Sequence, residues 1–337
     1  MLQAKTSCAK KRDIGIQCER APLCFQQFLN GSQQNFVHFT GVTKENFEVL
    51  YNVIGGDEIC SLIKYNYDVS TPVKKFESLL PNRDRMFITL VRLRRGLPLR
   101  DLSYLFGISL KTASVIIYSW TRFMSERFRR YEPKMFVTKE HQDLTPNPLF
   151  EEFPNLRVIL DSTDIEIQHP KHFGMQGNTW APYKAENCIK YMIGIARSGA
   201  FIFVSQGIEG SASDNKIFMQ SGILNKLKRN DAIMVDRGYD MEAELNARGI
   251  IVYSPSFLGK KRDHLTGREE ISSKLLASRR IFVEMAMGKI WAFRLIRYQV
   301  PNKLIPVVDD LVFSAAFISN LAEEYVPNSH DNCDEDE

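Results

Sequence analysis

Residues 156–161, LRVILD, and residues 232–236, AIMVD, are two short apolar runs that each end in an aspartate. Runs of this length and composition predict buried β-strands. Asp161 is expected at the end of the first strand of the domain and Asp236 at the end of the fourth. A carboxylate beside a buried strand is costly unless it is paired, hydrogen-bonded or metal-bound. Both aspartates are therefore candidate site residues, and helix capping is the alternative role for each.

The segments around these two runs predict the rest of an α/β domain. Two apolar runs joined by a tight turn at Ser198-Gly199 predict a β-hairpin, and the pair Ser213-Asp214 is expected to cap a helix. The expected elements are strands over 191–196, 201–205 and 250–253 and helices over 216–227 and about 269–291. Hairpin-paired strands followed by strands that alternate with helices predict a mixed sheet flanked by helices.

Glu284 lies in the middle of the last predicted helix, in the segment SRRIFVEMAMGKI (278–290). Two strand-end aspartates and one helical glutamate form a candidate site for a divalent metal ion, because Mg²⁺ prefers a few carboxylate oxygens and keeps water ligands. Two such ions about 3.5–4 Å apart would activate a water molecule and stabilise the leaving 3′ oxygen of a phosphodiester.

The segment LSYLFGISLKTASVII (102–117) predicts a helix-turn-helix, with a turn at Gly107 and a helix cap at Ser109. A further helix over about 82–95 precedes it. Such a motif commonly places its second helix in the major groove of DNA. Residues 71–136 hold fourteen Lys and Arg against five Asp and Glu, which favours DNA contact over the alternative of an ordinary helical hairpin.

The composition sets the outer limits of the prediction. The chain has 337 residues and a net charge of only +4, and it lacks an apolar run of eighteen residues, so no membrane span is expected. Its N-terminal residues lack the apolar core of a secretory signal. Six dispersed cysteines predict reduced thiols and no zinc finger. The predicted divisions are a disordered segment (1–35), a helical DNA-binding module (36–136), a nuclease domain (150–322) and an acidic disordered tail (326–337).

Four segments occur in an order that is typical of one known family: VILDSTDIEIQHP (158–170), GSASDNKIFMQSGIL (210–224), DAIMVDRGYD (231–240) and SRRIFVEMAMGKI (278–290). They resemble the DDE superfamily endonuclease domain of PIF/Harbinger-like transposases, in which a helix-turn-helix also precedes the nuclease domain. The 47 residues between Asp236 and Glu284 are typical of that group. The resemblance implies a ribonuclease H-like fold, with Asp161, Asp236 and Glu284 as catalytic ligands of Mg²⁺ or Mn²⁺. Asp214 matches a further family position, and a role next to the site and a role as helix cap remain equal alternatives.

Several other residues are candidate contacts to DNA. Lys111 and Thr112 begin the second helix of the motif and are expected to meet base edges. The candidates for phosphate contact are Arg94, Arg95, Arg100, Lys171, Lys184, Lys190, Lys260 and Lys261, with simple solvation as the alternative for the lysines. Trp180 and Tyr183 are expected in the core, and stacking on an unpaired base is their alternative. Asp164 should face away from Asp161 along an extended strand.

The resemblance implies a DNA-cutting and strand-transferring enzyme whose partner is DNA. The alternative is a transposase-derived DNA-binding or regulatory protein that does not cut. A metal-dependent hydrolase of other phosphoesters fits less well, because the helix-turn-helix and the basic segment would have no use in it. The nucleus is the expected location, with the cytoplasm as the alternative. A separate DNA-binding protein and a second copy of the chain remain open as further partners.

Overall fold

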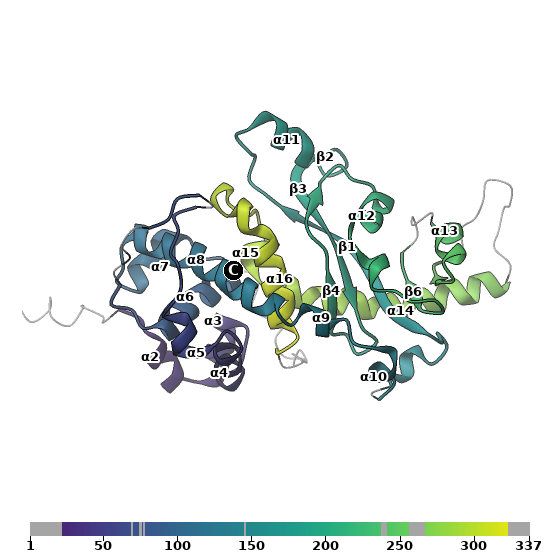
Figure 1. Ribbon diagram of the computed structural model, residues 1–337, viewed down its shortest axis with the longest axis horizontal. Helices are drawn as coiled ribbons and strands as arrows, with labels where there is room; N and C mark the ends of the chain where they lie inside the picture. Colours follow the sequence, from purple (N-terminus) through teal and green to yellow (C-terminus); the bar gives the residue numbers. More distant parts are fainter. Residues whose placement is uncertain are drawn as a thin grey trace, which may run out of the picture.

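The computed structural model describes residues 22–68, 70–73, 76, 78–144, 146–236, 241–255 and 267–322. A helical part lies beside a mixed β-sheet that has helices on both faces (Figure 1). The helical part comprises α2 (Phe25–Asn30), α3 (Gln33–Thr40), α4 (Lys44–Val53), α5 (Gly56–Cys60), α6 (Asn82–Arg95), α7 (Leu99–Leu105) and α8 (Leu110–Arg129). The connection to the sheet holds α9 (Glu132–Met135), α10 (Lys139–Asp143) and a short 3₁₀ turn, η1 (Pro148–Phe150).

The sheet and its helices follow in the second half of the chain. The strands are β1 (Leu156–Glu166), β2 (Trp180–Ala181), β3 (Glu186–Ile195), β4 (Phe201–Val204), β5 (Ile208–Glu209), β6 (Ala232–Met234) and β7 (Ile251–Tyr253). The helices are α11 (Phe173–Thr179), α12 (Asp214–Gln220), α13 (Glu242–Ala247), α14 (Gly267–Trp291), α15 (Arg294–Arg297) and α16 (Val308–Ser319), with 3₁₀ turns η2 (Ile223–Asn225) and η3 (Asn302–Val307).

Strand order and direction make the sheet mixed. β1 lies in the centre, antiparallel to β3 on one side and parallel to β6 on the other, and β7 continues the sheet in parallel beyond β6. The short strands β2, β4 and β5 all pair with the outer edge of β3. The predicted α/β class with a mixed sheet is confirmed, and this order fits the ribonuclease H-like arrangement that the resemblance implies.

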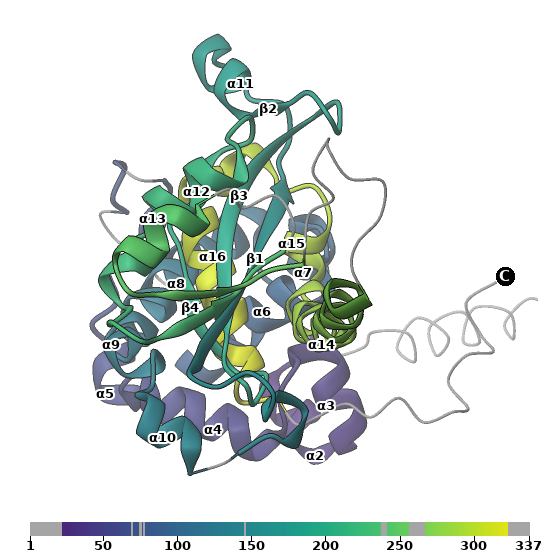
Figure 2. The same ribbon diagram turned by 90° about the vertical axis from the view of Figure 1, so that its right-hand side faces the viewer.

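The two faces of the sheet pack against different helices. Ile159 and Ile165 of β1 belong to the core that contains α14 and α16, whereas Val158 and Leu160 belong to a second core formed with α12 and α13. Figure 2 shows α12 and α13 on one side of the sheet and α14 on the other. Because successive residues of a strand point to opposite faces, β1 from Val158 onward presents odd-numbered side chains to the α14 face and even-numbered ones to the α12 face.

The predicted helix-turn-helix is present as α7 and α8. The hydroxyl of Ser109 accepts a hydrogen bond from the N–H of Thr112, which caps α8 as expected. Gly107 adopts a φ of +62° in the turn, a backbone conformation that favours glycine. Local sequence signals were sufficient here because each helix end is fixed by a residue within one turn of it.

Helix α8 is buried along most of its length. Its residues 113–121 are all buried between α6 and α7 on one side and α16 on the other. Its first turn is exposed at Leu110 and Lys111, and its C-terminal half is exposed at Arg122 and Glu126. The expectation that the second helix of the motif lies in the major groove can therefore apply to its first turn and not to residues 113–121, which are buried.

The sequence-based prediction of disorder over residues 1–35 is wrong for its described part. Residues from Phe25 onward form α2 and the start of α3, and Phe25 is buried against Phe36, Phe47 and Phe87. The N–H of Phe25 also donates to Asp84. Apolar side chains spaced through a polar segment obscured this contact with the helical core. Residues 1–21 and the predicted acidic tail (326–337) lie outside the described residues.

No helix in the described part of the chain is by itself long and apolar enough to span a membrane. The bent pair α7–α8 meets the same criterion only when its two helices are taken together.

Candidate metal centre and nucleic-acid interface

Asp161 lies in the middle of β1 and not beyond its end, so the predicted strand boundary was wrong. The strand continues to Glu166 because Thr163 and Ile165 remain buried while Ser162 and Asp164 are half-exposed, which is the alternation of a one-sided strand. Asp161 pairs across the sheet with Ile193, a residue of the α14-side core. The Asp161 side chain is therefore directed to the α14 face, and it is half-buried there.

Asp236 lies two residues beyond the end of β6. Within the parallel β1–β6 ladder, Ile159 is paired with Met234. Continuing this register by two residues brings Asp236 beside Asp161, on strands whose usual separation is about 4.8 Å. Met234 belongs to the α14-side core and Val235 to the opposite one, so an extended chain places Asp236 on the same face as Asp161. Two of the three predicted carboxylates thus occupy neighbouring positions.

Glu284 lies on the exposed side of α14. Its neighbours Val283, Ala286 and Met287 are buried in the core that α14 shares with the sheet and α16. This confirms the prediction that the helix packs against the sheet. Glu284 itself is exposed. Among the described residues, no three His, Cys, Asp or Glu side chains are grouped closely enough to hold a metal ion. A ligand role for Glu284 therefore remains the prediction that the family resemblance made.

The pair of aspartates fits one part of a magnesium site. Mg²⁺ is commonly bound by one or two carboxylates together with phosphate oxygens of the substrate and several waters. Asp161 and Asp236 offer two carboxylates of that kind on one face. One carboxylate oxygen of Asp161 accepts a hydrogen bond from the N–H of Ser162 at 3.0 Å, which fixes its orientation.

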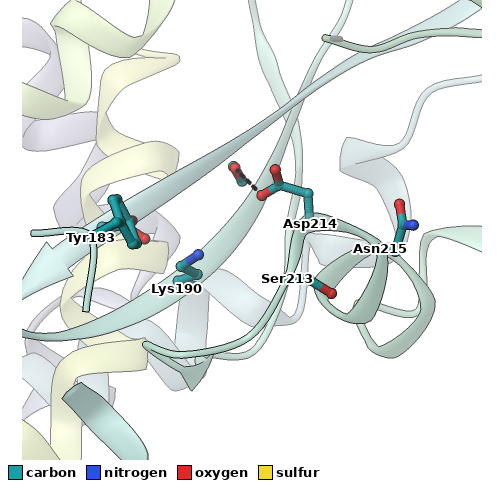
Figure 3. A pocket seen from close by; sticks show the side chains of 7 residues that line it. Tyr183, Lys190, Ser213, Asp214 and Asn215 are labelled. Carbon is teal, nitrogen blue, oxygen red and sulfur yellow. Dashed lines mark hydrogen bonds between the residues drawn. The ribbon is translucent and has the colours of Figure 1, made fainter. Parts of the chain in front are cut away.

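A pocket of about 470 Å³ opens on the opposite, α12 face of β1 (Figure 3). It is lined by Ser162, Asp164, Tyr183, Lys190, Ser213, Asp214 and Asn215. The hydroxyl of Ser162 donates to Asp214 at 3.1 Å, and this hydrogen bond joins β1 to the first turn of α12. The cap of α12 is Ser213, whose hydroxyl accepts from the N–H of Lys216. The capping residue is therefore Ser213 and not Asp214, and the carboxylate of Asp214 is directed to this pocket, on the face of β1 opposite Asp161.

Asp164 is held at the pocket by two donors. The ammonium of Lys184 lies 2.7 Å from its carboxylate, and the hydroxyl of Tyr183 donates to it. Burial and this hydrogen bond raise the pKa of Tyr183, so its hydroxyl remains a donor at neutral pH. As predicted, Asp164 faces away from Asp161, since it pairs across the sheet with Lys190. Lys184, a candidate for phosphate contact, is engaged in this ion pair.

Lys190 does not fit its predicted role as a contact to DNA phosphates. It is 8% exposed, and its ammonium donates to the backbone carbonyl of Ala212 at 2.8 Å. Neighbouring Cys188 is also buried, which raises the pKa of its thiol to about 11. Lys190 therefore forms part of the floor of the pocket and does not offer a free ammonium to a phosphate.

The candidate DNA contacts of the helical part differ in exposure. Arg100 and Lys111 are exposed, and the Lys111 ammonium lies 5.0 Å from the centre of the Tyr67 ring. Arg94 instead stacks on Phe293, 5.4 Å from the ring centre, and burial lowers the pKa of Arg94 and of Arg95. Thr112 contributes its N–H to the cap of α8. Lys260 and Lys261 lie outside the described residues, and Lys171 is exposed.

Comparison with known families gives two matches in the same order as the structure. Residues 160–320 match a family model described as DDE superfamily endonuclease. Residues 78–130 match a family model described as the helix-turn-helix of DDE superfamily endonuclease. The first match runs from within β1 to the end of α16, and the second contains α6, α7 and α8. No curated protein and no solved structure matches the chain.

Proposed function

Because this chain carries the DDE superfamily endonuclease domain and the helix-turn-helix of that superfamily, we propose that it is a transposase-like endonuclease that binds and cuts DNA. Cleavage would depend on Mg²⁺ or Mn²⁺ bound to Asp161, Asp236 and Glu284. The neighbouring positions of Asp161 and Asp236 on one face of the sheet are the observation that supports the proposal most directly.

The chemistry assigns separate tasks to the chain and to the metal. When bound, the metal ions supply an activated water or 3′-hydroxyl nucleophile and stabilise the leaving oxygen. Two adjacent strands would position the metal ligands. Asp161 lies within β1, and Asp236 lies only two residues beyond the end of β6. Glu284 would complete the ligand set from α14. The proposed site lies on the sheet face that packs against α14. The DNA would approach this face beyond the C-terminal end of β6, where the two aspartates lie.

Duplex binding is the task proposed for the helical part. Within the motif, the first turn of α8 and the exposed side of α7 are the parts that would meet DNA, because residues 113–121 of α8 are buried. Arg100 fits a phosphate contact, and Lys111 fits a contact within the groove. A protein that acts on chromosomal DNA would be located in the nucleus, which we also propose and which a fluorescent fusion of the chain would test.

The proposal is tested by incubating the purified full chain with supercoiled plasmid. We expect nicked or linear product with Mg²⁺ or Mn²⁺ and none with EDTA, since the carboxylates alone cannot activate water. Metal binding has its own readout, because a bound ion raises the midpoint of thermal unfolding. If plasmid is bound but never cut with either ion, the alternative function stands: a transposase-derived DNA-binding or regulatory protein.

A second prediction concerns the two exposed cations of the helix-turn-helix. Arg100→Ala should weaken binding to every duplex sequence by several-fold and lower the slope of log K against log salt by about one, as expected for one phosphate contact. Lys111→Ala should weaken binding to an extent that depends on the sequence. Arg248→Ala removes the same charge from the exposed face of α13 and is the matched control. Equal salt slopes for Arg100→Ala and the control would contradict the assignment.

A further inference from the structure

Residues 171–184 form a projection that carries exposed aromatic side chains. This α11–β2 projection extends from the end of the sheet in both views (Figures 1 and 2). Phe173 is 87% exposed, Trp180 40% and Tyr183 62%. The sequence-based expectation that Trp180 and Tyr183 belong to the core is wrong, because the short strand β2 leaves both rings at the surface. Large exposed aromatic groups of this kind commonly mark a binding surface.

The base of the projection is fixed, so the position of its rings is defined. The side-chain amide of Asn187 donates to the carbonyl of Gln176 and to the hydroxyl of Thr179, both at 2.9 Å. Gly210 packs directly against the backbone of Thr179, at the base of the projection. A β-carbon at residue 210 would lie 2.3 Å from the carbonyl oxygen of Thr179. The close approach requires glycine at this position and anchors the projection to the sheet.

Tyr183 connects the projection to the pocket on the α12 face. Its ring lines the pocket, and the Lys190 ammonium lies 5.0 Å from the ring centre (Figure 3). Its hydroxyl is held by Asp164, so the ring has a fixed orientation. With more than half of the residue exposed, the ring still offers surface on which a flat group could stack.

The lining of the pocket suits a neutral, planar and polar ligand. Lys190 and the adjacent Lys184 balance the two carboxylates of Asp164 and Asp214, so neither a free phosphate nor a lone cation would find a surplus of opposite charge. The described residues form no metal-holding group there either. Hydroxyls, an amide and carboxylates supply both donors and acceptors around the cavity, which is the complement that the edge of a nucleobase requires.

We infer that this pocket, with the Tyr183 ring as its stacking platform, takes an unpaired nucleobase of the DNA substrate. The inference rests on the proposed function, because it names a second contact with the same DNA. Lys171 is exposed on the projection and would contact the sugar-phosphate chain that leads to the base. Ser162 lines the pocket and is the residue directly after Asp161, but the two side chains point to opposite faces of β1. The base is therefore not that of the cut nucleotide, because the pocket and the proposed metal site lie on opposite faces of the sheet.

The test measures binding of the full chain to DNA in EDTA, so that cleavage plays no part. The probes are a fluorescein-labelled oligothymidylate and the same strand paired with oligodeoxyadenylate, followed by anisotropy. Tyr183→Ala should raise the Kd for the single strand on the order of 10- to 100-fold, as expected for the loss of one base-stacking contact, and leave the Kd for the duplex unchanged. Trp180→Ala should have a smaller effect of the same kind.

Two controls separate stacking from other causes. Tyr183→Phe keeps the ring and loses the hydrogen bond to Asp164, so it should bind the single strand as the unaltered chain does. Tyr298→Ala removes a ring that is 57% exposed at the end of α15, away from the projection and from the helix-turn-helix, and should leave single-strand binding unchanged. Thermal unfolding midpoints show whether each variant is folded, and Trp180→Ala carries the test if Tyr183→Ala is not.

Each outcome has a defined meaning. Duplex binding by the unaltered chain with no effect of Tyr183→Ala or Trp180→Ala on the single strand overturns this inference and leaves the proposed function standing. Equal weakening for single strand and duplex indicates a general loss of affinity and also overturns it. An unaltered chain that binds neither probe contradicts both proposals. If Tyr183→Ala selectively loses single-strand binding but the unaltered chain never cuts plasmid, this inference is supported and the proposed cutting activity is contradicted.

Discussion

Asp236→Asn is expected to abolish metal-dependent cleavage of plasmid DNA and to leave DNA binding intact. The change keeps the size of the side chain and removes its negative charge, so the site loses one of its two neighbouring carboxylates. Metal ligation contributes several kcal/mol of transition-state stabilisation, and the rate should therefore fall by about 10²- to 10³-fold or more. In the proposed division of tasks the cations of the helical part hold the DNA, so the Kd in EDTA should not change.

The matched measurements use three variants in one assay. Asp161→Asn should reproduce the loss seen for Asp236→Asn, because the two side chains lie in adjacent register. Glu244→Gln is the control, since it neutralises an exposed carboxylate on α13 that pairs only with Arg248. The Mg²⁺-induced rise in the unfolding midpoint should disappear in both aspartate variants and persist in the control. Cleavage at the unaltered rate by Asp236→Asn would refute the assignment of this carboxylate.

Glu284→Gln tests the third predicted metal ligand, which the structure does not group with Asp161 and Asp236. A loss of cleavage as large as that of Asp236→Asn would mean that α14 brings Glu284 to the metal when DNA is bound. Its exposure leaves the side chain free to turn, whereas Asp161 lies within a strand and cannot move without its neighbours.

Features of the fold that depend on nearby residues could be predicted from the sequence. The helices over residues 82–130 were expected from a cap at Ser109 and from glycines at 96 and 107, and all three signals act within one turn of the chain. The strands that carry Asp161 and Asp236 were expected from short runs of apolar residues. A mixed sheet was expected from hairpin-paired strands followed by strands that alternate with helices.

Features that depend on distant residues could not be predicted in the same way. The length of β1 was underestimated because polar residues follow Asp161, and only pairing with β3 makes their alternation informative. Trp180 and Tyr183 were assigned to the core because aromatic residues usually are, yet β2 is too short to cover them. The burial of α8 depends on α16, which lies nearly two hundred residues later in the chain. Local spacing contains none of this information.

Val312→Asp is expected to unfold the helical part and the nuclease domain together. Val312 is fully buried in α16, a helix that contacts α8 on one side and β4 and α14 on another. An unpaired carboxylate at such a position costs several kcal/mol, which is a large share of the roughly 5–15 kcal/mol that stabilises a typical domain. Duplex binding by the helix-turn-helix should therefore be lost along with the sheet, although the substituted residue lies outside residues 78–130.

Denaturant unfolding followed by circular dichroism and by duplex binding measures this coupling. Val312→Ala should shift the transition by roughly 1–3 kcal/mol without splitting it, because it removes apolar volume and adds no charge. Met285→Asp makes the same kind of apolar-to-acidic change at a side chain that is 67% exposed and should be nearly neutral. If Val312→Asp retains full duplex affinity and a separate transition for the helices, the helical part folds by itself. The division at residue 136 would then be a true domain boundary, and α16 would pack against the helical part without being needed for its folding. A single joint transition means instead that the residues after 294 are part of the scaffold that holds the DNA-reading turn of α8 in place.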